Sequence, residues 1–101
     1  MSMKDSGVRK FFVIVTYDIV KTKKRTRVMK LLKGSGYHVQ KSVFECFLDE
    51  GQLEFLIVKL SQEIDEEHDS VRIYRIPDNR QTDVEILGVG EIPEEAQLTI
   101  I

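Results

Sequence analysis

Apolar residues occupy nearly every position from residue 11 to residue 19, in the stretch FFVIVTYDI. This run is rich in aromatic and β-branched side chains, which predicts a strand. The pattern then changes to apolar residues three and four positions apart, at Val28, Leu31 and Leu32. That spacing predicts a helix from residue 22 to about residue 33, ended by a glycine cap in the sequence Gly34-Ser35-Gly36.

The segment from residue 38 to residue 48 predicts a second strand, because apolar side chains alternate toward both of its faces. Asp49 follows, with Gln52 three positions later, a spacing typical of a capping box at the start of a helix. The clearest amphipathic pattern of the chain comes next, at Leu53, Leu56, Ile57, Leu60 and Ile64. It predicts a second helix with one apolar face.

Shorter segments follow this helix. Residues 70–76 predict a third strand, Pro77-Asp78-Asn79 a turn, residues 84–89 a fourth strand, and residues 96–101 a strand-like tail. This order fits an α+β sandwich of the ferredoxin-like type, with two helices on one face of a mostly antiparallel sheet. The βαββαβ order of that fold needs a hairpin between the helices, so we expect a bend within residues 38–48.

The apolar tail at the end of the chain points to a partner. On a monomer, Leu98, Ile100 and Ile101 would form an exposed, aggregation-prone edge. Pairing with a second subunit would bury these side chains.

The composition excludes several classes of protein. With 101 residues, 42% apolar and 32% charged, the chain is predicted to form one soluble globular domain. No apolar run approaches the ~20 residues of a membrane span, and Asp18 interrupts the N-terminal run before it resembles a signal peptide. A cytoplasmic location is therefore expected. The single cysteine, Cys46, excludes an internal disulfide and most cysteine-based metal sites.

The net charge of −2 hides a strong asymmetry along the chain. Residues 1–50 carry 11 Lys or Arg against 5 Asp or Glu, a formal charge of +6. Residues 51–101 carry 4 against 12, a formal charge of −8. Either the molecule has a cationic face available to nucleic acid, or the two halves interleave in the fold and neutralise each other.

Asp18 is the one acidic residue of the first predicted strand. Burying it without a partner would be costly, so it is a candidate site residue. Mg²⁺ commonly uses one or two carboxylates with waters and substrate phosphates. Two-fold symmetry would place Asp18 beside its own copy, and metal-activated water could then attack a phosphodiester. The alternative is structural, with Asp18 capping the next helix or pairing with Lys21 or Arg25.

Six cations and no acid lie between residues 21 and 30. On the predicted helix, Lys23, Arg27 and Lys30 share one polar face, and Arg25 projects from another side. This run indicates either a phosphate-binding surface or an ordinary solvated face.

The aromatic and histidine residues are less informative. Tyr17 and Phe44 either stack on bases or, like most strand aromatics, belong to the core. His38 and His68 are too far apart in the sequence, and have too few companions, to form a metal-binding motif.

Five segments together resemble one known family: VTYDI, KRTR, HVQKSVFECFL, DSVRIYRI and VEILG. They are similar to the CRISPR-associated protein 2 family, the small subunit of the machinery that acquires new CRISPR spacers. The resemblance covers residues 11–101 and implies a ferredoxin-like fold. It also implies a homodimer in which each terminal strand joins the partner's sheet. The expected division is one domain, 1–101, with a core at 8–92 and the terminal strand at 93–101.

The resemblance also implies site residues. Asp18 matches the family's proposed Mg²⁺ ligand and catalytic residue, with one ion shared by Asp18 of both subunits. Arg25 and Arg27 match arginines implicated in handling nucleic acid, and the position of His38 is arginine in some relatives. With the lysines of the polar helix face, the expected nucleic-acid-binding residues are Tyr17, Lys23, Arg25, Arg27, Lys30, His38 and Phe44.

Two classes of function follow from the resemblance. One is a metal-dependent endonuclease that cleaves RNA or duplex DNA during CRISPR spacer acquisition. The other is a non-catalytic scaffold that binds duplex DNA and bridges dimers of the CRISPR integrase subunit. A plain oligomerising or ligand-sensing domain is a third interpretation of the same fold.

Overall fold

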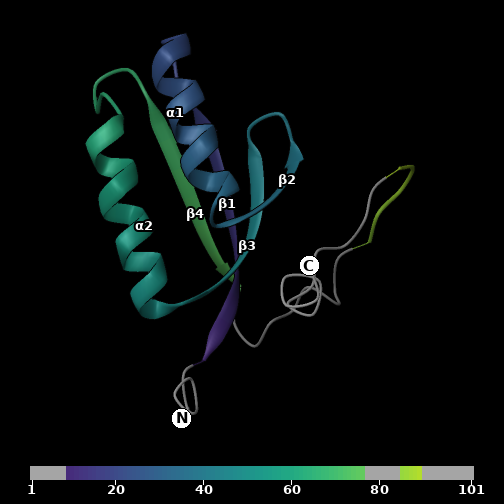
Figure 1. The fold of residues 1–101 in the computed structure, drawn as a ribbon. Helices are drawn as coiled ribbons and strands as arrows, with labels where there is room; N and C mark the ends of the chain where they lie inside the picture. Colours follow the sequence, from purple (N-terminus) through teal and green to yellow (C-terminus); the bar gives the residue numbers. More distant parts are fainter. Residues whose placement is uncertain (1–8, 77–84, 90–101) are drawn as a thin grey trace.

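The computed structural model describes residues 9–76 and 85–89 of the chain (Figure 1). In that part of the chain, four strands and two helices follow one another in the order βαββαβ. The elements are β1 (Lys10–Asp18), α1 (Thr22–Lys33), β2 (Gly36–Gln40), β3 (Val43–Asp49), α2 (Glu50–Glu63) and β4 (Ser70–Ile76).

The strands form one antiparallel sheet in the order β2-β3-β1-β4, and both helices lie on the same side of it (Figure 1). The first strand of the chain is central, because β1 pairs with β3 on one side and with β4 on the other. This arrangement confirms the predicted α+β class and the predicted element order.

The two faces of β1 meet different surroundings. Its odd-numbered side chains enter the core between the sheet and the helices, as shown by Val13, Val15 and Tyr17. On the other face, Phe12 packs against Phe47 of β3 with ring centroids 5.4 Å apart. Strand alternation places Ile14, Thr16 and Asp18 on that same second face, which no described helix covers.

The predicted strand at residues 38–48 is instead a hairpin of β2 and β3, so a single strand was wrong and the expected bend is confirmed. The turn falls at Lys41 and Ser42, where neither glycine, proline, asparagine nor aspartate marks it. Long-range bonds hold it, since the backbone N–H of Tyr17 donates to the Ser42 carbonyl at 3.1 Å. Contacts with the neighbouring strand β1 therefore help to fix this turn.

The two glycines after α1 have different roles. Gly34 adopts a right-handed φ of −74°, so the left-handed conformation typical of a glycine cap is not formed. Gly36 begins β2 opposite Cys46 of β3. A Cβ atom at residue 36 would lie 2.5 Å from Cys46 Sγ and 2.5 Å from the Glu45 carbonyl oxygen. The close approach of these two strands therefore requires glycine at position 36.

Cys46 lies at the centre of the core and is fully buried. Burial, with a smaller contribution from the Glu45 carboxylate, raises the pKa of its thiol to about 12. A thiol that stays protonated is a weak nucleophile, which agrees with the interpretation of Cys46 as a small apolar core residue.

Helix α2 begins with the predicted capping box. The Asp49 carboxylate accepts a 2.7 Å hydrogen bond from the Gln52 backbone, and the Gln52 side chain accepts a 2.9 Å bond from the Asp49 N–H. The predicted apolar face of the helix is buried at Leu53, Leu56 and Leu60. Both sequence signals for this helix are confirmed.

The last described segment, residues 85–89, forms no strand, so the predicted strand at 84–89 is wrong over these residues. Gly88 has a φ of +92°, outside the extended region, and Leu87 and Val89 are 97% and 99% exposed. Val84, the predicted turn at 77–79 and the tail at 93–101 lie outside the described residues. Among the helices that the structure describes, none is long and apolar enough to cross a membrane.

Candidate functional site

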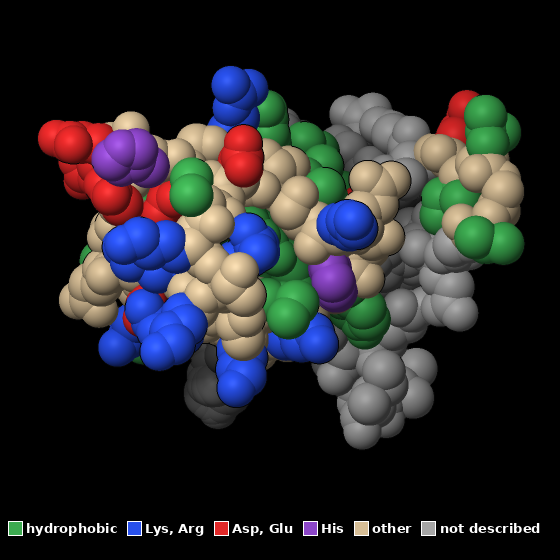
Figure 2. Space-filling view, turned by 90° about the horizontal axis from the view of Figure 1, so that it is seen from above, with side chains coloured by type: hydrophobic (Ala, Val, Ile, Leu, Met, Phe, Trp, Pro, Cys, Tyr) green, Lys and Arg blue, Asp and Glu red, His purple; other side chains and the backbone are tan. Residues whose placement is uncertain are grey.

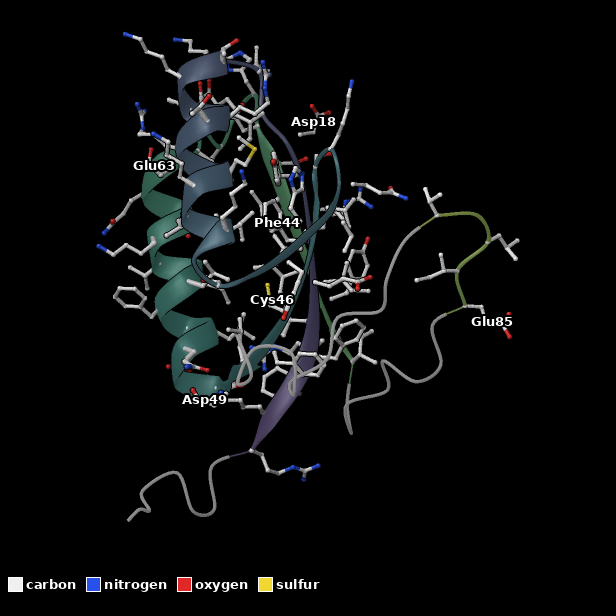
Figure 3. The ribbon with its side chains drawn as sticks, turned by 45° about the vertical axis from the view of Figure 1, so that its right-hand side comes forward. Asp18, Phe44, Cys46, Asp49, Glu63 and Glu85 are labelled. Atoms are coloured by element: carbon white, nitrogen blue, oxygen red, sulfur yellow. The ribbon has the colours of Figure 1, made fainter. Side chains whose placement is uncertain are left out.

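Asp18 is the last residue of β1 and is exposed (Figure 3). In the described part of the chain, its carboxylate accepts no hydrogen bond and forms no ion pair. The structural alternative is therefore wrong: Lys21 is the N-cap of α1 without a side-chain cap bond, and Arg25 bonds elsewhere. Because Asp18 is exposed, it also avoids the desolvation cost expected of a buried carboxylate.

A groove passes Asp18 at the end of the sheet, between the start of α1 and the β2–β3 turn. The residues that line it come from three separate parts of the chain: Tyr17, Asp18, Ile19, Arg25, Thr26, Met29, Lys41 and Ser42. The fold therefore brings Asp18 together with two cations, Arg25 and Lys41, at one opening. Lys41 and Ser42 were not among the predicted site residues.

Arg25 holds the connection between β1 and α1. Its guanidinium donates to the Ile19 carbonyl at 2.8 Å, to the Val20 carbonyl at 3.4 Å and to the Thr22 hydroxyl at 3.0 Å. The same connection is held from the other side, where the Val20 N–H donates to the Asp69 carboxylate at 3.0 Å. A guanidinium has five N–H donors, so Arg25 retains capacity for a phosphate in the groove.

The polar face of α1 is exposed as predicted, but its three cations differ. Arg27 pairs with Glu63 of α2, with Nε and Oε1 2.7 Å apart. Neither Lys23 nor Lys30 has an ion-pair partner among the described residues. Exposed pairs such as Arg27–Glu63 contribute about 0–1 kcal/mol, so the pair does not lock the helices together.

At the end of the molecule that carries Asp18 and the start of α1, basic side chains of residues 1–50 lie close to acidic side chains of residues 51–101. Figure 2 shows Lys and Arg side chains spread over it and acidic side chains gathered at one edge beside a histidine. Arg27 and Glu63 join the two halves directly. The halves therefore neutralise each other in part, and the cations around Lys23 and Lys30 are left facing solvent.

Tyr17 and Phe44 lie inside the core, 6% and 0% exposed. Their rings are 6.4 Å apart, and the His38 ring of the neighbouring strand β2 stacks on Phe44 at 4.6 Å, nearly parallel. Because Phe44 is fully buried, its ring offers no free face to a base. Burial raises the pKa of the Tyr17 phenol and the nearby Arg25 charge lowers it less, so Tyr17 remains a hydrogen-bond donor at neutral pH.

His38 is exposed at the edge of the sheet, and its Nε2 lies 3.0 Å from the Lys41 carbonyl oxygen. A carbonyl oxygen only accepts, so Nε2 carries the proton in this contact. The Tyr17 hydroxyl donates to the same oxygen at 3.3 Å. Two residues expected to bind nucleic acid thus contact the β2–β3 turn.

A second acidic group lies in the α2–β4 loop, where Asp65, Glu67 and His68 could offer ligand atoms within 4.8 Å of one another. The Asp65 and His68 side chains already contact each other. Hydrogen bonds from the His68 side chain and the Glu67 backbone lower the pKa of Asp65. This group organises its loop, and Asp18 does not belong to it.

The comparisons with known proteins agree with this fold. The family model for CRISPR associated protein Cas2 matches residues 11–84. The chain is 43% identical over 81 residues to CRISPR-associated endoribonuclease Cas2 3 of Chloroflexus aurantiacus, covering 80% of this chain and 87% of that protein. It is 44% identical over 81 residues to CRISPR-associated endonuclease Cas2 of Halalkalibacterium halodurans, covering 75% and 84%.

A solved structure shows the same likeness in three dimensions. The crystal structure of Streptococcus pyogenes Cas2 at pH 6.5 superposes with a TM-score of 0.69 at 39% identity, covering 76% of this chain and 99% of that one. Sequence and fold lead to one conclusion. The chain belongs to the Cas2 family of CRISPR-associated proteins.

Proposed function

We propose that the protein is a metal-dependent endonuclease that cleaves phosphodiester bonds of RNA or duplex DNA in CRISPR spacer acquisition. The observation that carries this proposal is the exposed Asp18, without a described partner, in a groove that also holds Arg25 and Lys41. Two relatives of similar sequence are named as an endoribonuclease and an endonuclease. The carboxylate and the two cations supply the charges that such chemistry needs at a phosphodiester.

The proposed active form is a homodimer. Each chain contributes one site carboxylate, and Asp18 lies on the sheet face that no described helix covers. A two-fold axis over this face would place the two Asp18 side chains opposite each other. The terminal strand, residues 93–101, would extend the partner's sheet and so bury its apolar residues.

The residues present fit a magnesium ion. Asp18 is exposed and its oxygens are not engaged by described residues, so a pair of such carboxylates matches the few protein ligands that Mg²⁺ accepts. When bound, the ion would supply an activated water for attack on phosphorus. Asp18 of both subunits would hold it, and Arg25 would orient the phosphodiester and offset its charge.

The direct test measures cleavage of a labelled single-stranded RNA and a labelled duplex DNA at several Mg²⁺ concentrations. We expect cleavage of at least one substrate, complete loss with EDTA, and recovery when Mg²⁺ is added in excess. Ca²⁺ serves as the control for metal binding without efficient chemistry. Cleavage that persists in EDTA would contradict a metal-dependent site.

A second function is supported by a separate observation, the unpaired cations on α1. A non-catalytic scaffold that bridges dimers of the CRISPR integrase subunit would need to bind duplex DNA by its backbone. Lys23 and Lys30 face solvent without ion-pair partners in the described part of the chain, as such binding requires. The scaffold and the nuclease share this binding surface and differ only in what Asp18 does.

Lys23→Gln combined with Lys30→Gln is expected to weaken duplex binding and to make its salt dependence shallower. For every phosphate that the protein no longer neutralises, the slope of log K against log salt should fall by about 0.9. Arg27→Gln is the matched control, because Arg27 must first leave Glu63 to reach a phosphate. A smaller effect is expected for it. Unchanged binding by the double lysine variant would show that the polar face of α1 is an ordinary solvated surface and does not bind phosphates.

A further inference from the structure

Three hydrogen bonds hold the β2–β3 turn, two from Tyr17 of β1 and one from His38 of β2. The Tyr17 N–H donates to the Ser42 carbonyl at 3.1 Å, and the Tyr17 hydroxyl lies 3.3 Å from the Lys41 carbonyl. His38 Nε2 donates to that same Lys41 oxygen at 3.0 Å. The hydroxyl contact is the longest and weakest of the three. Together they fix the backbone of Lys41 relative to the end of β1.

The rings that make these bonds are themselves fixed. Phe44 of β3 is fully buried, with the Tyr17 ring of β1 at 6.4 Å and the His38 ring of β2 at 4.6 Å. A stack of three rings across neighbouring strands leaves little freedom to the groups that hold the turn. The position of the turn is therefore set by the core.

This geometry separates two roles. Tyr17 and Phe44 are buried and cannot present a ring face to a nucleic acid. Lys41, whose backbone the rings hold, is exposed and lines the groove beside Asp18 and Arg25. None of the described acidic residues forms an ion pair with Lys41. The ammonium group is thus available to an anion that enters the groove.

We propose that Lys41 binds a backbone phosphate of the nucleic acid at the Asp18 site, and that Tyr17 and His38 position it through its carbonyl oxygen. The proposal deepens the proposed function and rests on it for the location of the substrate. The ligand chemistry is a phosphodiester anion, which RNA and DNA share. Lys41 is a substrate-binding residue, whereas Tyr17 and His38 act on substrate only through the turn.

Binding is tested with Lys41→Met in an Asp18→Ala background, so that no cleavage disturbs the measurement. Affinities for a short duplex DNA and for a single-stranded RNA of the same sequence are compared over a range of salt. Without the ammonium group at one phosphate, binding of the preferred substrate should weaken about tenfold and the salt slope should fall by about 0.9. Lys41→Arg should restore most of the affinity.

Lys59→Met is the matched control, because Lys59 lies over the Phe55 ring on α2 and does not line the groove. If Lys41→Met and Lys59→Met weakened binding equally, Lys41 would act only through the net charge of the protein, and the proposal would be overturned. In the active protein, Lys41→Met should raise KM more than it lowers kcat, since the lysine binds the phosphate already in the ground state.

The positioning role is tested by a double-mutant cycle with His38→Phe, which keeps a ring on Phe44 and removes the Nε2 donor. It should weaken binding when Lys41 is present and have no further effect in the Lys41→Met protein. Tyr17→Phe forms a second cycle with the same expectation and a smaller effect. Additive losses would assign both residues a purely structural role and overturn their positioning role.

The two proposals fail in distinguishable ways. If the wild type cleaves neither substrate, the nuclease is wrong, and the binding assay in the Asp18→Ala background still decides about Lys41. If cleavage depends on Asp18 but binding is indifferent to Lys41→Met on both probes, only the role of Lys41 is wrong.

Discussion

Asp18→Ala is expected to reduce Mg²⁺-dependent cleavage to the level of a reaction without protein. The variant lacks the carboxylate that we propose holds the metal in each subunit, and no other described acidic residue lines the groove. Because Asp18 is exposed and without a described partner, the stability of the fold should change by less than about 0.5 kcal/mol. Duplex binding should also remain close to that of the wild type. Cleavage is measured on the RNA and DNA substrates by gel, and binding by fluorescence anisotropy.

Asp18→Asn is the matched control for this result. The amide has the shape of the carboxylate and one oxygen, but not the charge, so it should be nearly as inactive as alanine. An Asp18→Ala protein that cleaves as fast as wild type would mean that a contaminating nuclease or another site is responsible. If Asp18→Asn cleaved normally and Asp18→Ala did not, cleavage would require the shape of the side chain at position 18 and not its negative charge.

Gly36→Ala is expected to have the largest effect on stability, a loss of about 1–3 kcal/mol in the free energy of unfolding. The added Cβ would lie 2.5 Å from both Cys46 Sγ and the Glu45 carbonyl oxygen, and 3.0 Å from Cys46 Cα. Two of these three atoms are backbone of the neighbouring strand, so β2 must shift to make room. The urea midpoint should fall while the slope of the transition stays constant.

Gly34→Ala is the matched control, two residues away. Its Cβ would meet only the Leu31 carbonyl oxygen at 3.5 Å, and its φ of −74° suits any residue. Stability should be unchanged or rise by up to about 1 kcal/mol, because alanine restricts the unfolded chain. Equal losses for the two variants would point to a general need for flexibility after α1 rather than to a close approach of strands.

The sequence predicted those parts of the fold that depend on local signals. The apolar run of β1, the spacing of Val28, Leu31 and Leu32 in α1, and the capping box of Asp49 and Gln52 each act over a few residues. The turn at Lys41 and Ser42 could not be located, because Ser42 alone is a weak turn signal and two of the three bonds that hold the turn come from Tyr17, 24 residues before Lys41. The position of this turn therefore depends largely on contacts between distant parts of the chain and not on local propensity.

The site was predicted in part for the same reason. Asp18 and Arg25 were recognised because they lie close in the sequence, at the end of one element and the start of the next. The pairing of Arg27 with Glu63, 36 residues later, and the placing of Lys41 beside Asp18 depend on tertiary structure. Strand aromatics at positions 17 and 44 are equally consistent with a base platform and with a core, and only burial separates the two.

The buried thiol of Cys46 can report on the opening of the core without any added label. Cys46 is the sole cysteine of the chain, it is fully buried, and its pKa of about 12 leaves almost no thiolate at neutral pH. A thiol reagent can therefore react only when the core between sheet and helices opens. The rate of labelling of unmodified protein then measures the free energy of that opening, and bound metal, nucleic acid or a second subunit should each slow it by the amount that it stabilises the closed state.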